Sequence, residues 1–504
     1  MCGRIDRERR RAALCFPFPQ WTRGAKRGGE SPRVILRGAV RAAGGGLLKK
    51  SYEIDMVNGP LLGKMLLFSV PLMLSGILQL LFNAADVIVV GQFSGSEALA
   101  AVGSTSALIN LLVNVFMGLS IGANVLTARF AGARDAAELA DTVHTSIAIS
   151  LISGVALIAI GVPLAEPLLL LMGTPEDVIG QATLYMQIYF CGMPVIMLYN
   201  FGAAILRAVG DTKRPLYFLL IAGCVNVAFN LLFVIVFHMG VAGVALATVI
   251  SQCVSAGLVL LCLMRADGPY RVDLRKLRIH RSKLLQIVRV GLPAGVQGAI
   301  FSVSNVLIQS SVNSFGSIAM AGNSASSNLE GFIYTSMNAV YQTSLNFTSQ
   351  NLGAGKRERL TPILLRCLGV VVGIGAGLGL IFYLLRYPLL GIYTSDPEVA
   401  AYGFLRLEVF CATYFLCGMM DVCCGSIRGL GYSMLPTIVS LTGACGLRIL
   451  WIVTVFQWDR TLWILYLSYP VSWAITGAAH LLCFILVMRR QKRKGGGQAS
   501  PAMG

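Results

Sequence analysis

Charged side chains are scarce in this chain of 504 residues, where Asp, Glu, Lys and Arg together make up 13% of the sequence. A soluble domain carries about 25% charged residues, whereas 56% of this chain is hydrophobic. The shortage of charge excludes an ordinary soluble protein and indicates an integral membrane protein. Glycine is abundant, with 55 residues, which suits the close packing of helices in lipid.

Other absences exclude classes of site. Only four His are present, so a His-rich metal or catalytic site is not expected. The 13 Cys show no metal-binding spacing and give no reason to expect a disulfide framework. A nucleophile elbow and nucleotide-binding motifs are also missing, so we expect no enzyme, no cofactor, no bound nucleotide and no nucleic acid partner. The net charge of +18 has another origin, because Lys and Arg gather in the tails and in alternate loops.

Twelve apolar segments follow residue 60. Each is long enough to cross about 30 Å of hydrocarbon as a helix, and a helix bundle is favoured because lipid does not tolerate open sheet edges. The predicted spans are residues 65–92, 99–127, 143–164, 184–205, 215–237, 241–264, 287–310, 320–346, 363–385, 403–426, 434–456 and 462–488.

Basic residues alternate between the loops. The even-numbered connections carry groups such as Arg129 with Arg134, whereas the odd-numbered ones carry only Arg386 and Arg460. Positively charged loops stay on the cytoplasmic side. This predicts a multi-pass protein of the plasma membrane with both termini in the cytoplasm.

The chain repeats itself. Pro71 and Pro293 lie at matching positions, as do Asn83 and Asn305. The segment GSEALAA in the first half corresponds to GSIAMAG in the second. Six spans per half is an even number, so both halves enter the membrane from the same side and the repeat is parallel. We therefore predict an all-α integral membrane protein with twelve transmembrane helices in two six-helix lobes, a frame suited to alternating access.

The predicted domains follow from this repeat. Residues 1–55 read as a disordered basic cytoplasmic extension, or as the product of an upstream start with Met56 as the alternative. The remaining predicted divisions are a first lobe at 60–264, a basic cytoplasmic linker at 265–284, a second lobe at 285–488 and a basic cytoplasmic tail at 489–504.

A carboxylate, Asp86, lies inside the first apolar run. A charge at that depth is costly, so such an acid is by default a candidate functional site; the alternative is a helix end wetted by headgroups. Asn226 and Asn230 are four residues apart and share a helix face, and Thr248 lies at a matching depth in the next span. These four side chains offer oxygen atoms that suit a hard cation or a proton relay, although each Asn or Thr alone is explained by hydrogen bonds between helices.

The second half has charges of its own. Glu330, Asp421 and Arg448 lie within predicted spans, and because buried charges are normally paired we expect Arg448 to pair with Glu330 or Asp421. A structural salt bridge and direct coupling remain alternatives for this charge network.

Several other side chains have less specific interpretations. Arg207 and Arg428 are interpreted as anchors on the cytoplasmic side, and His480 as a packing residue. Soft or aromatic side chains near the cleft are candidates for a drug pocket, because such side chains adapt to many ligands. They are Met193, Tyr199 and Met419.

The segments LFNAADVIVVGQFSG, GLSIGANVLTARFAGA, LRAVGDTKRP, QNLGAGK and SIRGLGYSMLP resemble the multidrug and toxic compound extrusion (MATE) family over about residues 52–488. The resemblance implies a secondary active antiporter that exports organic, often cationic, compounds in exchange for H⁺ or Na⁺. It also implies a cation site at Asp86, Asn226 and Thr248. Where relatives carry an Asp in the fifth helix this chain has Asn230, which favours H⁺ over Na⁺.

Two other functions remain as alternatives. A flippase for lipid-linked oligosaccharides shares this fold but is expected to have a basic cleft, whereas Arg448 is the clear intramembrane cation against three acids. A membrane-embedded enzyme is the remote alternative. The expected partners are therefore small organic substrates and the bilayer, and we expect a monomer.

Overall fold

The computed structural model describes residues 52–495, without the side chains of Ser96, Leu99, Ala107 and 492–495. The predicted disordered extension at 1–55 lies almost entirely outside these residues. Within 52–495 every regular element is a helix and no strand occurs, which confirms the predicted all-α class.

The first half contains α2 to α8 and one π-helical stretch. Its elements are α2 (Leu61–Phe93), α3 (Gly95–Ala133), α4 (Ala136–Leu171), α5 (Glu176–Cys191), α6 (Met193–Ala208), α7 (Lys213–Leu231), the π-helical η1 (Leu232–Val236) and α8 (Gly240–Met264).

The second half begins after a short 3₁₀ turn, η2 (Leu274–Lys276), in the connection between the halves. Its elements are α9 (Arg281–Asn313), α10 (Ser317–Gly353), η3 (Arg357–Arg359), α11 (Leu360–Leu384), α12 (Arg386–Gly391), α13 (Pro397–Gly429), α14 (Met434–Ser440), the π-helical η4 (Leu441–Gly446), α15 (Leu447–Val453), α16 (Val455–Trp458) and α17 (Leu462–Gly495).

Ten helical segments of the described chain are long and apolar enough to cross a membrane, and the bent pair α5 and α6 makes an eleventh. The bend of 50° falls at Gly192, just before Pro194, because proline cannot donate the backbone hydrogen bond that would continue the helix. The remaining predicted span, 320–346, lies in α10, which is 37 residues long but rich in Ser, Asn and Thr. Most of these polar side chains are buried against other helices, which explains how a polar helix occupies the middle of the bundle.

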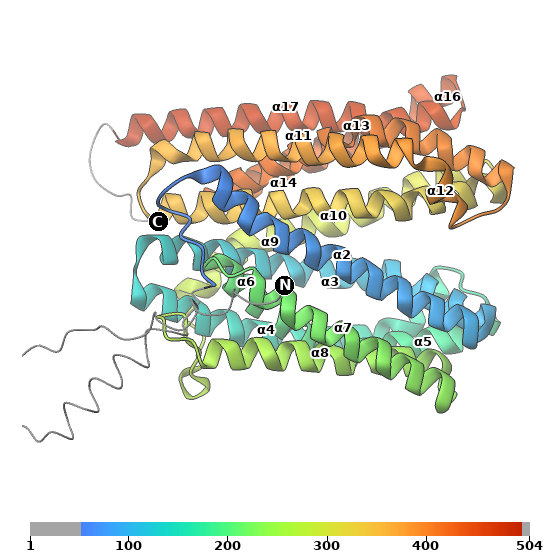
Figure 1. Ribbon diagram of the computed structural model, residues 1–504, viewed down its shortest axis with the longest axis horizontal. Coiled ribbons are helices and arrows are strands. Elements are labelled where there is room, and N and C mark those ends of the chain that lie inside the picture. Colours follow the sequence, from blue (N-terminus) through green and yellow to red (C-terminus); the bar gives the residue numbers. More distant parts are fainter. Residues whose placement is uncertain (1–51, 496–504) are drawn as a thin grey trace, which may run out of the picture. The chain divides into compact units, whose positions relative to one another are not determined.

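Figure 1 shows α10 to α17 gathered on one side of α2 and α9, and α3 to α8 on the other. Helices of the two halves meet where α3 packs against α9 and α2 packs against α10. The two backbones approach closely at Gly118, where an added Cβ would lie 2.2 Å from the backbone nitrogen of Gly295. Glycine is required there because any side chain would force the two backbones apart.

The internal repeat is visible in the backbone. Pro71 lies inside α2 and its counterpart Pro293 lies inside α9. Gly210 and Gly431, which occupy matching positions after the fourth and tenth spans, both adopt positive φ angles of 103° and 91°. Matching sequence therefore produces matching turns in the two halves.

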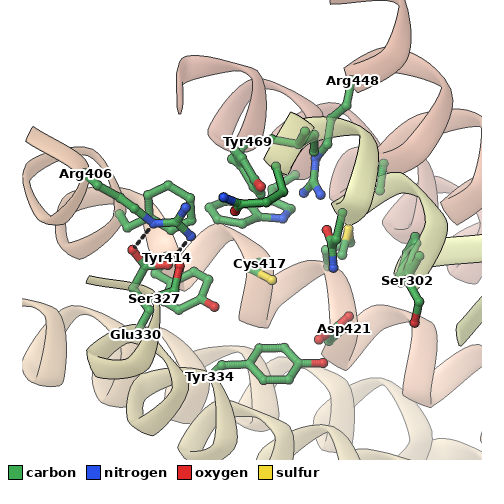
Figure 2. Close-up of a pocket in the computed structure, with 18 of the residues that line it drawn as sticks. Ser302, Ser327, Glu330, Tyr334, Arg406, Tyr414, Cys417, Asp421, Arg448 and Tyr469 are labelled. Carbon is green, nitrogen blue, oxygen red and sulfur yellow. Dashed lines mark hydrogen bonds and ion pairs between the residues drawn. The ribbon is translucent and has the colours of Figure 1, made fainter. Parts of the chain in front are cut away.

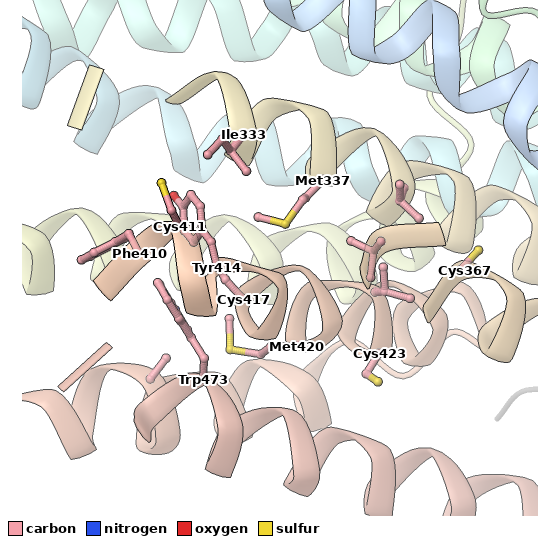
Figure 3. Packing of buried hydrophobic residues seen from close by; sticks show 14 of the residues in the cluster. Ile333, Met337, Cys367, Phe410, Cys411, Tyr414, Cys417, Met420, Cys423 and Trp473 are labelled. Carbon is pink, nitrogen blue, oxygen red and sulfur yellow. The ribbon is translucent and has the colours of Figure 1, made fainter. Parts of the chain in front are cut away.

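The apolar core of the second half contains sulfur-bearing side chains (Figure 3). Met337 and Met420 pack with Cys411, Cys417 and Cys423 in one cluster of buried residues. These cysteines are free thiols that act as small apolar side chains. The core of this half thus consists of adaptable side chains around α10 and α13.

Candidate functional site

The four polar residues predicted from the first half form one connected chain. Asn230 Nδ2 donates a hydrogen bond to Asp86 Oδ1 and lies 3.3 Å from Asn226 Oδ1. Asn226 Nδ2 in turn lies 3.5 Å from the hydroxyl of Thr248. The chain links α2, α7 and α8, because the four-residue spacing of the two asparagines puts both on one face of α7.

The surroundings of Asp86 combine apolar and polar groups. Asn230 is completely buried, and its Oδ1 atom has no hydrogen-bond partner among the described residues. Tyr185 and Tyr189 of α5 stack with ring centroids 6.2 Å apart, and both phenols interact electrostatically with Asp86. A buried acceptor without a donor, next to a carboxylate, suits a proton or a small cation that would supply the missing interaction.

Helix α7 changes form directly after this cluster. The backbone is π-helical from Leu232 to Val236, and His238 then adopts a left-handed φ of 51°. Such π-helical stretches are often found at functional sites. Periodicity in the sequence gives no sign of this change, since an apolar run reads the same in either helix type.

The charge network of the second half differs from the prediction. Glu330 on α10 pairs with Arg406 on α13 and not with Arg448, through contacts of 2.7 Å from Nε to Oε1 and 2.8 Å from Nη2 to Oε2. Asn323 accepts a further hydrogen bond from Arg406 Nη1. This two-pronged geometry is the strong form of an arginine–carboxylate pair. Arg406 was not among the predicted site residues, although it lies inside the predicted span 403–426.

Arg448 is held by neutral partners. Its Nε atom donates to Ser472 Oγ at 2.9 Å, and its guanidinium lies 4.2 Å from the ring centroid of Tyr469. Within residues 52–495 Arg448 forms a close ion pair with neither Glu330 nor Asp421, although Asp421 interacts electrostatically with both Arg428 and Arg448. Arg448 follows the π-helical stretch η4 by two residues, which sets the rotation of this part of the helix.

A cavity of about 530 Å³ opens between α9, α10, α13, α15 and α17, with Asn114 of α3 at its edge. Two acids, Glu330 and Asp421, and two arginines, Arg406 and Arg448, line it together with aromatic rings (Figure 2). The lining of the cavity therefore carries balanced charge, because Arg406 adds a cation that the prediction had not counted. The proposed pocket residues Met193, Tyr199 and Met419 are not among its lining residues.

Two basic side chains taken from the sequence have different surroundings. Arg428 was predicted as a cytoplasmic anchor, but it is 5% exposed and donates to Tyr341 Oη at 2.9 Å and Gln297 Oε1 at 2.7 Å. It therefore joins α13 to α10 and α9 within the protein. His480 is fully buried, with Nε2 3.0 Å from Ser440 Oγ, in agreement with a packing role. Within the described residues no group of three metal-binding side chains occurs.

Comparison with known proteins agrees with the duplicated fold. The MatE family model matches residues 71–232 and again 293–454. The chain is 28% identical over 423 residues to the probable multidrug resistance protein YoeA of Bacillus subtilis, covering 82% of this chain and 91% of YoeA. It is 25% identical over 396 residues to a FAD transporter of Shewanella oneidensis, covering 77% of this chain and 86% of that protein.

Solved structures share the same architecture. A MATE transporter of the MOP superfamily in an outward-facing conformation superimposes with a TM-score of 0.82 at 21% identity, over 88% of this chain and all of that one. At this identity the likeness shows the fold, and the two family-model matches cover well over half of the sequence. The chain belongs to the MatE family of multidrug and toxic compound extrusion transporters.

Proposed function

We propose that this multidrug efflux transporter is an antiporter that exports small organic compounds from the cytoplasm in exchange for H⁺, and that Asp86 carries the proton. The observation that supports the proposal best is the hydrogen-bonded chain from Asp86 through Asn230 and Asn226 to Thr248. Relatives named as multidrug resistance and multidrug export proteins support the export of small organic molecules.

Asn230 can change its hydrogen bond with Asp86 when the carboxylate is protonated. Its amide nitrogen now donates to Asp86, while its own oxygen is buried without a partner. A protonated Asp86 becomes a donor and needs an acceptor, so a rotation of the Asn230 amide by half a turn would present the free oxygen to it. Protonation would thereby reverse the hydrogen bond between α2 and α7.

Coupling to H⁺ is favoured over Na⁺ by the number of acids. Asp86 is the one carboxylate in the hydrogen-bonded chain, and the other three members are neutral. One carboxylate neutralises one proton, whereas a Na⁺ site that replaces the hydration shell generally needs several oxygen ligands. The proposed orientation places the basic loops and both termini in the cytoplasm of the cell, in accordance with the positive-inside rule.

The test is ethidium efflux from cells that express the wild type, Asp86→Asn or the control Asp177→Asn, an exposed acid in the first turn of α5. The H⁺ and Na⁺ gradients are collapsed separately. We expect efflux by the wild type and the control to stop only when the H⁺ gradient is collapsed, and Asp86→Asn to show none. Efflux that follows Na⁺, or normal efflux by Asp86→Asn, would contradict the proposal.

A further inference from the structure

The connection between α8 and α9 exposes basic and apolar side chains together in residues 274–281, which we call the linker run. Its large apolar side chains Leu274 and Ile279 are 47% and 42% exposed. Water suits basic side chains but not large apolar ones, whereas the headgroup region of a membrane suits both. The exposed basic side chains of the run are Arg275, Lys276, Arg278 and Arg281.

The two ends of the linker run are attached to the first half of the protein. Directly before the run, Asp273 N donates to His144 Nε2 of α4 at 3.1 Å. Near its other end, His280 N donates to Thr145 Oγ1 at 3.2 Å. Figure 1 shows this connection, in yellow-green, beside the ends of α4 and α8. The backbone is therefore held against α4 at both ends of the run, and the exposed side chains lie between these attachments.

The attachments also define the depth of the run in the membrane. His144 and Thr145 lie at the start of the predicted span 143–164, about 12 Å along α4 from Ala136 at about 1.5 Å per residue. Leu263, at the end of the predicted span 241–264, accepts a hydrogen bond from Val272 N at 3.1 Å. Both spans thus place the run where apolar helix meets water, which is the level of the lipid headgroups.

Acidic partners for the run are few within the described residues. Lys276 Nζ lies 4.0 Å from Asp273 Oδ2, and both side chains are largely exposed. Arg275 and Arg281 form no ion pair within residues 52–495. The positive charge of the run is therefore available to a partner outside the described chain.

The basic connection between α10 and α11 has a different arrangement. Lys356 Nζ donates to Asn58 Oδ1 at 2.7 Å, and Arg359 Nη2 donates to Gly59 O at 2.9 Å. These bases are used within the protein, and residues 354–359 include no large apolar side chain. This connection therefore serves as an internal control for the linker run.

We propose that the linker run binds anionic phospholipids, with its basic side chains on the phosphates and Leu274 and Ile279 inserted below the headgroups. Arginine and lysine form strong charge-assisted hydrogen bonds with phosphate oxygens, and each base close to an anionic leaflet adds to the attraction. The segments outside residues 52–495 do not complement the run, because their charged residues are mostly basic. The inference rests on the proposed orientation, in which the basic loops face the anionic cytoplasmic leaflet.

The test is hydrogen–deuterium exchange of the purified full chain in two nanodiscs. One contains phosphatidylcholine, and the other contains phosphatidylcholine and phosphatidylglycerol at about 7:3. We expect the amides of residues 274–281 to exchange about tenfold more slowly in the anionic nanodisc, and those of residues 354–359 to be unchanged. The difference should disappear at about 1 M NaCl, where the Debye length falls to about 3 Å.

A triple variant assigns the effect to the basic side chains. Arg275→Gln, Lys276→Gln and Arg278→Gln together should abolish the slower exchange, because each lost charge lowers the affinity for an anionic surface about fivefold. The matched control is Arg357→Gln, at an exposed base of the connection between α10 and α11, which should retain the slower exchange of residues 274–281.

Equal exchange of residues 274–281 in the two nanodiscs would overturn the proposal. Equal slowing of residues 274–281 and 354–359 would also overturn it, because a general effect of the charged surface would then explain the result, and so would slowing that persists in the triple variant. The comparison on the wild type needs no variant, so misfolding of a variant does not remove the test. Both faces of a nanodisc carry the same lipid, so a wrong orientation would appear separately, as cleavage of the linker by trypsin added outside intact cells.

Discussion

Glu330 and Arg406 form the closest ion pair inside the second half, and both side chains are almost completely buried. Removing one partner leaves the other charge buried without compensation, which costs about 3–5 kcal/mol. We predict that Glu330→Gln lowers the free energy of unfolding by about that amount, measured by thermal unfolding in detergent. The matched control Glu408→Gln, at an exposed position of α13, should change it little.

The double variant Glu330→Gln with Arg406→Met separates a structural role from a ligand-binding one. Replacing a whole buried pair with apolar or neutral groups is often close to neutral in free energy. Recovery of stability in the double variant, together with retained ethidium efflux, would agree with a structural pair. Loss of efflux despite recovered stability would contradict it.

Asn230 provides a second test at the scale of single residues. Asn230→Asp places a second carboxylate against Asp86, because the side chain already lies in hydrogen-bond contact with it. Two acids and two further oxygen donors form a better Na⁺ site, so we predict that Na⁺ but not K⁺ stabilises this variant, as binding to the folded state must. The measurement is the thermal unfolding midpoint in NaCl and KCl at equal ionic strength. A wild type that already shows this Na⁺ effect would contradict the preference for H⁺.

Depth along a helix was enough to predict that Asp86, Asn226, Asn230 and Thr248 meet. The three helices that carry them, α2, α7 and α8, are neighbours, and helical spacing fixes which face each residue occupies. The partners of Arg448 and Glu330 could not be predicted in this way. Their pairing depends on the rotation of α13 and α15 about their axes, and the π-helical stretch η4 before Arg448 changes that rotation without a pattern in the sequence.

At the scale of elements, the segment before α2 connects the two halves at the end of the bundle that carries the basic loops. Ile54 N donates to Gly210 O at 3.1 Å in the first half, and Asn351 Nδ2 of α10 donates to Met56 O at 3.0 Å in the second. Burial alone would raise the pKa of Asp55. Hydrogen bonds from Asn58 and Val57 and the nearby charge of Lys64 outweigh this effect, so the pKa of Asp55 is lowered and its ionised form is favoured in the turn.

We predict that Asn351→Ala loosens this segment. A lost hydrogen bond contributes about 1 kcal/mol, so the amides of residues 54–57 should exchange with solvent about fivefold faster. Hydrogen–deuterium exchange of the purified protein measures this effect. The control Asn110→Ala, at an exposed position of α3, should leave the exchange of residues 54–57 unchanged. Unchanged exchange in Asn351→Ala would show that the segment is held by other contacts.

The polar helix α10 illustrates what the sequence could predict at this scale. Hydropathy alone does not identify it as a span, but the repeat does, because α10 occupies in the second half the place of α3 in the first. The 50° bend between α5 and α6 and the two π-helical stretches were not predicted. At the bend, Gly192 lies against Val249 of α8, which leaves no room for a side chain.

At the scale of the whole molecule, the two halves are in closest contact toward the basic loops. Gly118 approaches Gly295 there, and an added Cβ at Gly353 would lie 1.9 Å from Arg129 O. The cavity lies farther from these loops, beyond the glycine contact. A transporter that opens alternately to the two sides of the membrane must separate these backbones. The proposed trigger of this conformational change is the reversal of the hydrogen bond between Asp86 and Asn230.

The most direct test of coupling at Asp86 is ethidium transport in proteoliposomes that contain the purified chain and an imposed pH gradient, with Na⁺ absent. We expect the wild type to move ethidium against its gradient and Asp86→Asn to show no such transport. Transport that requires a Na⁺ gradient and ignores pH, or equal transport by Asp86→Asn, would contradict it.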